Sequence, residues 1–277
     1  MRKKRLCTLI AAFTLVFWTC ISMAQTATPI TTTVNGNTLN AKIQLSSQIE
    51  IDVILSFENA IGLSADNIDI SATLVSTNDV NILSRLPASG VSLFSSFPVI
   101  LSISPKQDKG FGFEGLGNVE IYTKAISYNA NMPARLFTAH NGGDFEDITS
   151  MVSAGSIRAR GSTGRFSDFL IVLDERSKMA ILSDKFDELE HVLVSNQALV
   201  NASLLSSLQT SLNSLDLTIS LANYNDALTL VNGLISVIES AENDAITTVW
   251  RSSGDVVNVQ GELLAHLKAM RYNLRVL

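Results

Sequence analysis

The clearest structural signal in the sequence is an alternating stretch, Ile49-Glu50-Ile51-Asp52-Val53-Ile54-Leu55-Ser56-Phe57. Its odd positions are all apolar and its even positions are mostly polar, which is the period of a strand with one buried face and one solvated face. The same alternation recurs in Phe97–Ile103, Val119–Thr123 and Arg135–Thr138. We therefore expect a β-rich N-terminal half.

The last strands of this half are predicted to form a closing hairpin. Gly155–Arg160 and Phe166–Leu173 are strand-like and flank a glycine-containing turn, Gly161–Gly164. The long helical runs that a parallel α/β sheet needs between its strands do not occur here. The turn spacing favours an antiparallel β-sandwich of roughly seven to nine strands.

The second half follows the period of an α-helix. Apolar residues recur at spacings of three and four in four stretches: 182–193, 205–222, 227–241 and 263–274. All five prolines precede residue 134, so the architecture changes near residues 172–176. Short connections between the four helices predict an antiparallel four-helix bundle, and the fold class is α+β. An apolar stripe is also compatible with a surface for a lipid or a partner helix, although burial within the bundle is the commoner use.

The N-terminus has the three parts of a secretory signal peptide. Four basic residues, Arg2–Arg5, precede the apolar stretch Leu6–Ile21, and a small-residue cleavage pattern ends at Ala24. We expect cleavage there and export to the periplasm or beyond. The alternatives are an uncleaved membrane anchor and a lipoprotein acylated on Cys20. The expected organisation is a signal peptide (1–24), a β-sandwich domain (25–173) and a helical bundle domain (174–277).

Composition excludes several function classes. The chain has 20 Lys and Arg against 26 Asp and Glu, and the basic side chains fall to 16 once residues 1–24 are removed. Such an acidic mature chain lacks the clustered cations that nucleic-acid binding requires. Cys7 and Cys20 both lie in the predicted signal peptide, so the mature chain has no disulfide, thiolate metal site or cysteine nucleophile. We expect no cofactor and no membrane span after cleavage.

One loop concentrates side chains that carry chemistry. His140 is followed closely by Asp144, Glu146 and Asp147. This group could activate a hydroxyl or hold a cation, so a periplasmic hydrolase or a cation-binding protein is one hypothesis. The alternative is a solvated hairpin loop in which Gly142-Gly143 makes the turn.

Two further features lie in the helical half. Glu262 and His266 are four residues apart on one helix face, which we interpret as a surface carboxylate–imidazole pair because no third metal ligand is indicated. Trp250, the only tryptophan after residue 24, is either an exposed interaction residue beside Arg251 or a buried structural side chain. As a structural side chain it closes the end of the bundle, which we favour, or bridges to the sandwich.

Several motifs carry a family resemblance: Phe97-Pro98-Val99, Ala134–Phe137, Asp147-Ile148-Thr149, Arg158–Gly161 and Phe166–Val172. On these residues the chain resembles an uncharacterised family of exported bacterial proteins with a β-rich N-terminal half and a helical C-terminal half. The resemblance implies export and the order of a β-rich half before a helical half, but it implies no activity and no site residues. Separately, residues 201–240 are similar in rhythm to a five-helix module of bacterial surface proteins.

The favoured hypothesis is an exported envelope or surface protein that binds or scaffolds without catalysis. Its partner would be an envelope protein or a surface ligand, and not a nucleic acid. The hydrolase hypothesis instead predicts a displaced His140 pKa and a cleft beside its loop. A third hypothesis makes the helical half a docking surface for a lipid or a partner helix.

Overall fold

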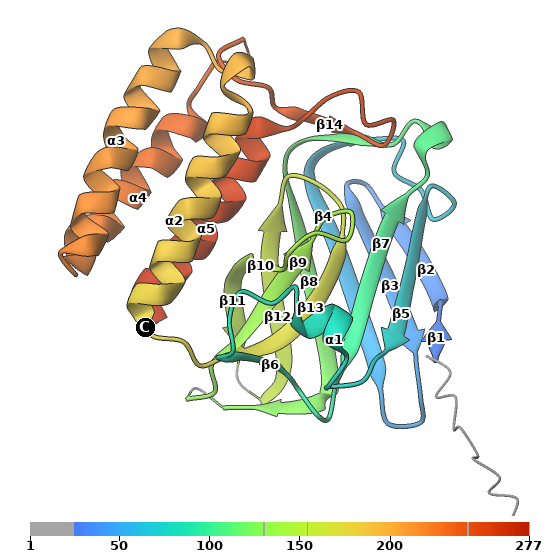
Figure 1. Cartoon of the computed structure of the whole chain (residues 1–277). Coiled ribbons are helices and arrows are strands. Elements are labelled where there is room, and N and C mark those ends of the chain that lie inside the picture. The colour runs from blue at the N-terminus through green and yellow to red at the C-terminus, as the bar shows by residue number, and fades with distance from the viewer. Residues whose placement is uncertain (1–24, 130, 154, 243, 277) are drawn as a thin grey trace, which may run out of the picture.

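The computed structural model describes residues 25–129, 131–153, 155–242 and 244–276 (Figure 1). The predicted signal peptide lies outside these residues. Strands predominate up to Asp174 and helices predominate after it, so the chain has an α+β fold. Within the described residues, no helix combines the length and the apolarity that crossing a membrane would need.

The described strands form two antiparallel sheets. Sheet A has the order β1 (Thr26–Ala27), β5 (Ile68–Leu74), β7 (Val99–Pro105), β13 (Asp168–Asp174), β9 (Ala134–Ala139) and β10 (Glu146–Asp147), with β6 (Val91–Leu93) also paired to β13. Sheet B has the order β11 (Thr149–Ser153), β12 (Gly155–Thr163), β8 (Gly112–Tyr128), β4 (Glu50–Ile61), β3 (Thr38–Gln44) and β2 (Pro29–Asn35), with β14 (Val249–Arg251) also paired to β8. The short helices α1 (Val80–Leu83) and η1 (Gln107–Lys109) lie in the connections.

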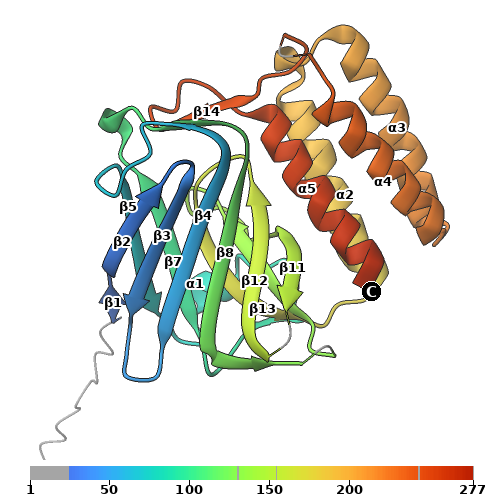
Figure 2. The same cartoon turned by 180° about the vertical axis from the view of Figure 1, so that it is seen from behind.

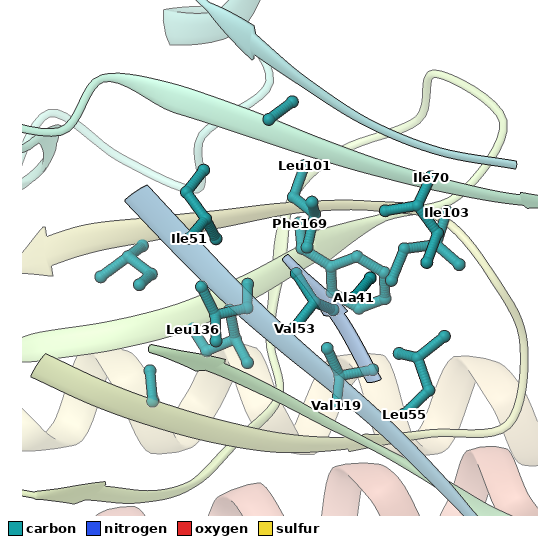
Figure 3. Close-up of a cluster of buried hydrophobic side chains, with 14 of the residues drawn as sticks. Ala41, Ile51, Val53, Leu55, Ile70, Leu101, Ile103, Val119, Leu136 and Phe169 are labelled. Carbon is teal, nitrogen blue, oxygen red and sulfur yellow. The ribbon is translucent and has the colours of Figure 1, made fainter. Parts of the chain in front are cut away.

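The two sheets share one hydrophobic core, and the predicted alternation is confirmed. In β4 the side chains of Ile51, Val53 and Leu55 are fully buried, whereas the residues between them are only half-buried. The buried side chains lie in one cluster with Leu101 and Phe169 of sheet A (Figure 3). Each sheet therefore turns an apolar face toward the other, as period-two patterning requires.

The predicted closing hairpin is wrong. β12 pairs with β8 and β11 in sheet B, whereas β13 pairs with strands of sheet A, so the connection crosses from one sheet to the other. Gly161 lies within β12 rather than in a turn, and a Cβ there would come within 2.7 Å of the Ile148 carbonyl oxygen. Because glycine has no Cβ, the two backbones can approach this closely. The sheets also hold more strands than expected, because strands of two or three residues show no recognisable alternation.

Four longer helices match the four predicted apolar stripes: α2 (Lys178–Ser195), α3 (Ala202–Ser220), α4 (Tyr224–Glu239) and α5 (Val259–Val276). The short helix η2 (Gln197–Leu199) lies in the connection between α2 and α3. Side-chain caps begin α3 and α4, where Asn201 accepts from the Leu204 amide and Asn223 from the Asp226 amide. The apolar stripes pack together into a second core.

Helix α5 joins this second core to the sheets. It contacts α2 and α4 on one side and β8, β11 and β12 of sheet B on the other (Figure 2). Leu116 of β8 belongs to the helical core. Gly261 lets the helix approach the sheet, because a Cβ there would lie 2.7 Å from the Gly115 carbonyl oxygen. Polar residues of α5 are therefore buried against sheet residues.

Candidate functional site

The loop that the sequence singled out is a hairpin whose two ends lie in different surroundings. Glu146 of β10 pairs with Thr138 of β9, and the turn between them includes Gly142 at a φ of 74°. Asp144 is exposed in this turn. His140 lies beside a cavity, whereas Glu146 and Asp147 lie where α2 and α5 meet the sheets. The structure therefore does not bring the four predicted residues together.

A cavity of about 360 Å³ lies beside His140 at one end of the sheets. Its walls come from the ends of β7 and β9, from the β12–β13 connection and from the segment 240–258 that joins α4 to α5, named here the strap. Asp168 lines the cavity from β13, and Trp250 and Ser252 line it from the strap. His140 and Trp250, which the sequence presented as separate features, thus border the same cavity.

Trp250 bridges the helical half to the sheets. It lies on β14, opposite Phe113 of β8. Its ring centroid is 5.5 Å from that of Phe113, 5.3 Å from that of Phe166 and 6.2 Å from that of Phe111. The favoured interpretation, closure of the bundle, is therefore wrong. The strap carries the side chain away from the helices because its backbone adds a strand to sheet B.

Ser252 borders the cavity from the strap. Its backbone N–H donates to the Phe111 carbonyl at 2.9 Å, while its buried hydroxyl has no hydrogen-bond partner among the described residues. The residue also lines a second cavity of about 260 Å³ that Val249 and Arg251 border. Because neighbouring strand residues face opposite ways, the two cavities lie on opposite faces of β14. An unpaired buried hydroxyl costs about 1–3 kcal/mol.

His140 presents a neutral imidazole at this cavity. Burial lowers its pKa below the ordinary value, and the nearby Arg165 charge acts in the same direction. The Nδ1 atom lies 2.8 Å from the Phe166 carbonyl oxygen, so Nδ1 carries the proton and Nε2 is free to accept. The Ser167 hydroxyl oxygen lies 3.3 Å from the same nitrogen of His140, and the Asp168 carboxylate accepts a hydrogen bond from the Ser102 hydroxyl. These groups do not form the serine–histidine–acid chain of a hydrolase, in which serine and acid contact opposite nitrogens.

A second polar cluster is buried between β10, α2 and α5. The Lys185 ammonium donates to the Asp147 carbonyl at 2.5 Å and to the Glu188 carboxylate, and lies 3.2 Å from His266 Nδ1. On the other side of the ring, His266 Nε2 is 3.8 Å from a carboxylate oxygen of Glu146. Among the described residues, Glu146, Glu188 and His266 are the histidine and acids whose ligand atoms gather within 4.8 Å.

Burial controls the charge states in this cluster. It lowers the pKa of His266 to about 3, and the Lys185 charge acts in the same direction, so the ring is neutral. Burial raises the pKa of both Glu188 and Glu262 above the usual carboxyl range. The interpretation of Glu262 and His266 as a surface pair is therefore wrong. Helical spacing shows that they share a face, but not that sheet B covers that face.

Asp147 has a structural position beside the same cluster. Its carboxylate accepts from the backbone and hydroxyl of Thr149, and from the side-chain amide of Asn273 on α5 at 2.7 Å. Asn273 in turn accepts from Arg135 of β9 at 3.0 Å. All four side chains are buried, so this network ties α5 to sheet A.

Sequence reasoning missed Lys185, Glu188 and Ser252. Lys185 did carry a signal, because it falls on the apolar stripe of α2 beside Leu182 and Leu189. A lysine at such a position is buried only with partners. Ser252 carried no comparable signal, since a serine in a polar connection is common.

The fold and these sites define an α+β protein in which two sheets and a set of helices meet at a buried, hydrogen-bonded junction. The chain belongs to DUF6689, a family of unknown function, whose profile matches residues 12–277. The predicted membership of an uncharacterised family is thus confirmed. No curated protein and no solved structure matches the chain significantly. The similarity to a five-helix surface module stays a prediction.

Proposed function

We propose that the mature chain is an exported, non-enzymatic binding protein, built as a β-sandwich followed by an antiparallel four-helix bundle, with its ligand site in the cavity between His140 and Trp250. The observation that carries this proposal is the cavity of about 360 Å³ that His140, Asp168 and Trp250 line together from three distant parts of the chain. Export rests on the signal-peptide pattern of residues 1–24.

The walls of the cavity favour a sugar as the ligand. Trp250 offers an aromatic surface, His140 Nε2 and the Asp168 carboxylate offer acceptors, and Ser104 offers a hydroxyl. A sugar ring combines a flat C–H face with hydroxyl groups that donate and accept. The volume, about 360 Å³, is at the small end of the range for ligand pockets. We infer a ligand of one or two sugar units, such as an end of an envelope glycan.

Trp250 makes this proposal directly testable, because it is the only tryptophan of residues 25–277. N-acetylglucosamine and its β-1,4-linked dimer would be titrated into the mature chain while the tryptophan emission is recorded. We expect a saturable change in the wild type, at least tenfold weaker binding for His140→Ala and Asp168→Ala, and no effect of Asp144→Ala. No saturable change with either sugar, or unchanged binding in both cavity variants, would contradict a sugar site.

The hydrolase hypothesis retains one specific observation. His140 has a lowered pKa and borders a cavity, as that hypothesis predicted. A neutral imidazole with a free Nε2 can act as a general base toward water. Incubation of the β-1,4-linked N-acetylglucosamine dimer with the protein, followed by chromatography of the products, distinguishes hydrolysis from binding. Monomer that forms with wild type but not with His140→Ala would favour hydrolysis over binding alone.

A further inference from the structure

Three elements that are distant in sequence direct metal-ligating side chains to one point. Glu146 comes from β10, Glu188 from α2 and His266 from α5. One carboxylate oxygen of Glu188 lies 3.4 Å from His266 Nδ1, and one of Glu146 lies 3.8 Å from His266 Nε2. The Glu146 side chain is 29% exposed and the Glu188 side chain is 19% exposed, so the cluster opens to solvent on their side.

The acceptors of this cluster already surround one cation. The Lys185 side chain is 1% exposed, and its ammonium lies among a backbone carbonyl oxygen, the Glu188 carboxylate and the His266 ring nitrogen. A buried ammonium requires such acceptors because it has left water. The site is therefore shaped to bind positive charge, which the chain supplies from its own α2.

Charged side chains from several elements surround the cluster. The acidic residues are Glu146, Asp147, Glu188 and Glu262, and the basic side chains that act on them are Arg135, Arg165, Arg176 and Lys185. Glu146 and Glu188 contribute two carboxylates beside His266. The double charge of a metal ion would attract these two carboxylates more strongly than the single charge of Lys185 does.

We propose that Glu146, Glu188 and His266 form a binding site for a divalent transition-metal ion, and that the Lys185 ammonium holds the same acceptors when no metal is bound. One imidazole nitrogen and two carboxylates suit zinc and its neighbours better than magnesium or calcium, which prefer oxygen alone. Three protein ligands leave a fourth position for water, as in exchangeable zinc sites.

The geometry needs only side-chain movement. Ligand atoms of one tetrahedral zinc ion lie roughly 3.3 Å apart, since each Zn–N or Zn–O bond is about 2.0–2.2 Å. The observed separations of 3.4 and 3.8 Å are close to this value, although they involve opposite nitrogens of the ring. A metal on one nitrogen therefore requires the carboxylate at the other to rotate. Both glutamate side chains are partly exposed, so neither is enclosed on all sides.

The test is calorimetric titration of the mature chain, residues 25–277, with Zn²⁺. We expect one ion per chain for wild type. Lys185→Met should bind at least tenfold more tightly, because it keeps an apolar stem but removes the competing charge. His266→Gln and Glu146→Gln should each weaken binding at least tenfold. His191→Gln is the matched control, since His191 is an exposed histidine on α2. Circular dichroism of each variant establishes that it is folded.

Each alternative outcome has a defined meaning. Wild-type affinity in both His266→Gln and Glu146→Gln would place zinc elsewhere and overturn the proposal. No binding by wild type would also overturn it, whether or not Lys185→Met binds, because the ammonium would then hold the acceptors permanently. If His266→Gln does not fold, Glu146→Gln decides, because its side chain lies at the exposed edge of the cluster.

Discussion

The Nζ atom of Lys185 on α2 lies 3.2 Å from the Nδ1 atom of His266 on α5. The two residues are 81 positions apart in the chain, and both are buried. The ammonium donates to a ring that burial keeps neutral, and it also donates to the Asp147 carbonyl of β10. This contact therefore joins two helices and a strand, and its energetics should be visible in the stability of the whole chain.

Acid should destabilise the metal-free protein through His266. Its pKa is about 3 in the folded protein against an ordinary value of 6.5, so the unfolded chain binds the proton more readily between these pH values. The free energy of unfolding therefore falls as the pH is lowered from about 6.5 to about 3, by a few kcal/mol in order of magnitude.

Urea denaturation of wild type and His266→Gln, with a chelator present, measures this contribution. The stability of wild type relative to the variant should fall across that pH window. The raised pKa of Glu188 acts in the opposite direction, since it favours folding as the pH falls, but Glu188 is present in both proteins. A pH-independent difference between the two proteins would show that His266 does not titrate as expected.

Loss of the Asp147 carboxylate should destabilise the junction strongly. Asp147→Ala removes the acceptor for Thr149 and Asn273, and it leaves Arg135 buried without the carboxylate that lies 4.0 Å from its Nε atom. Breaking a buried charged network in this way costs about 3–5 kcal/mol. Asp144→Ala, three residues away and exposed, should change the stability by less than about 0.5 kcal/mol. Similar losses for the two variants in urea denaturation would contradict this assignment.

Two glycine substitutions in helices should have opposite effects. Gly261→Ala places a methyl group 2.7 Å from the Gly115 carbonyl oxygen and should cost about 1–3 kcal/mol, because neither backbone can withdraw freely. Gly233 in α4 has no atom within 4 Å of an added Cβ. Gly233→Ala should therefore stabilise by about 0.5–1 kcal/mol through helix propensity. Thermal melts of the pair check both signs.

The sheets and helices should unfold together. Leu116 of β8 belongs to the helical core, and β14 of the strap belongs to sheet B. Trp250 emission reports on the end of the sheets, while far-UV circular dichroism reports mainly on the helices. We expect both signals to give the same urea midpoint. Separate midpoints would show that the predicted domains, 25–173 and 174–277, unfold independently.

Local hydrophobic patterns are sufficient to predict the order of strands and helices along the chain. Burial of one face imposes a period of two on a strand, as in Ile49–Phe57, and a period near 3.6 on each helix. The same patterns do not assign strands to sheets. Gly155–Arg160 and Phe166–Leu173 look alike whether they pair with each other or cross between sheets, because each buries one apolar face in either arrangement.

Of the candidate site, the sequence identified His140, Trp250, Glu146 and His266 as chemically capable residues, but it grouped them incorrectly. His140 and Glu146 are near neighbours in the chain and contribute to different sites. Lys185 was overlooked, because the hydropathy pattern of a helix is dominated by its apolar positions.

The α+β order, the apolar faces and the lack of cysteine after residue 24 follow directly from residue identity and local spacing. The positions of Glu146 and Glu188 on either side of His266, and of Trp250 and His140 beside one cavity, depend on how distant elements pack. A buried polar group pairs with whichever group lies near it in space. Hydrogen bonds and ion pairs act over a few ångströms, and the separation of two elements along the chain does not predict such a contact.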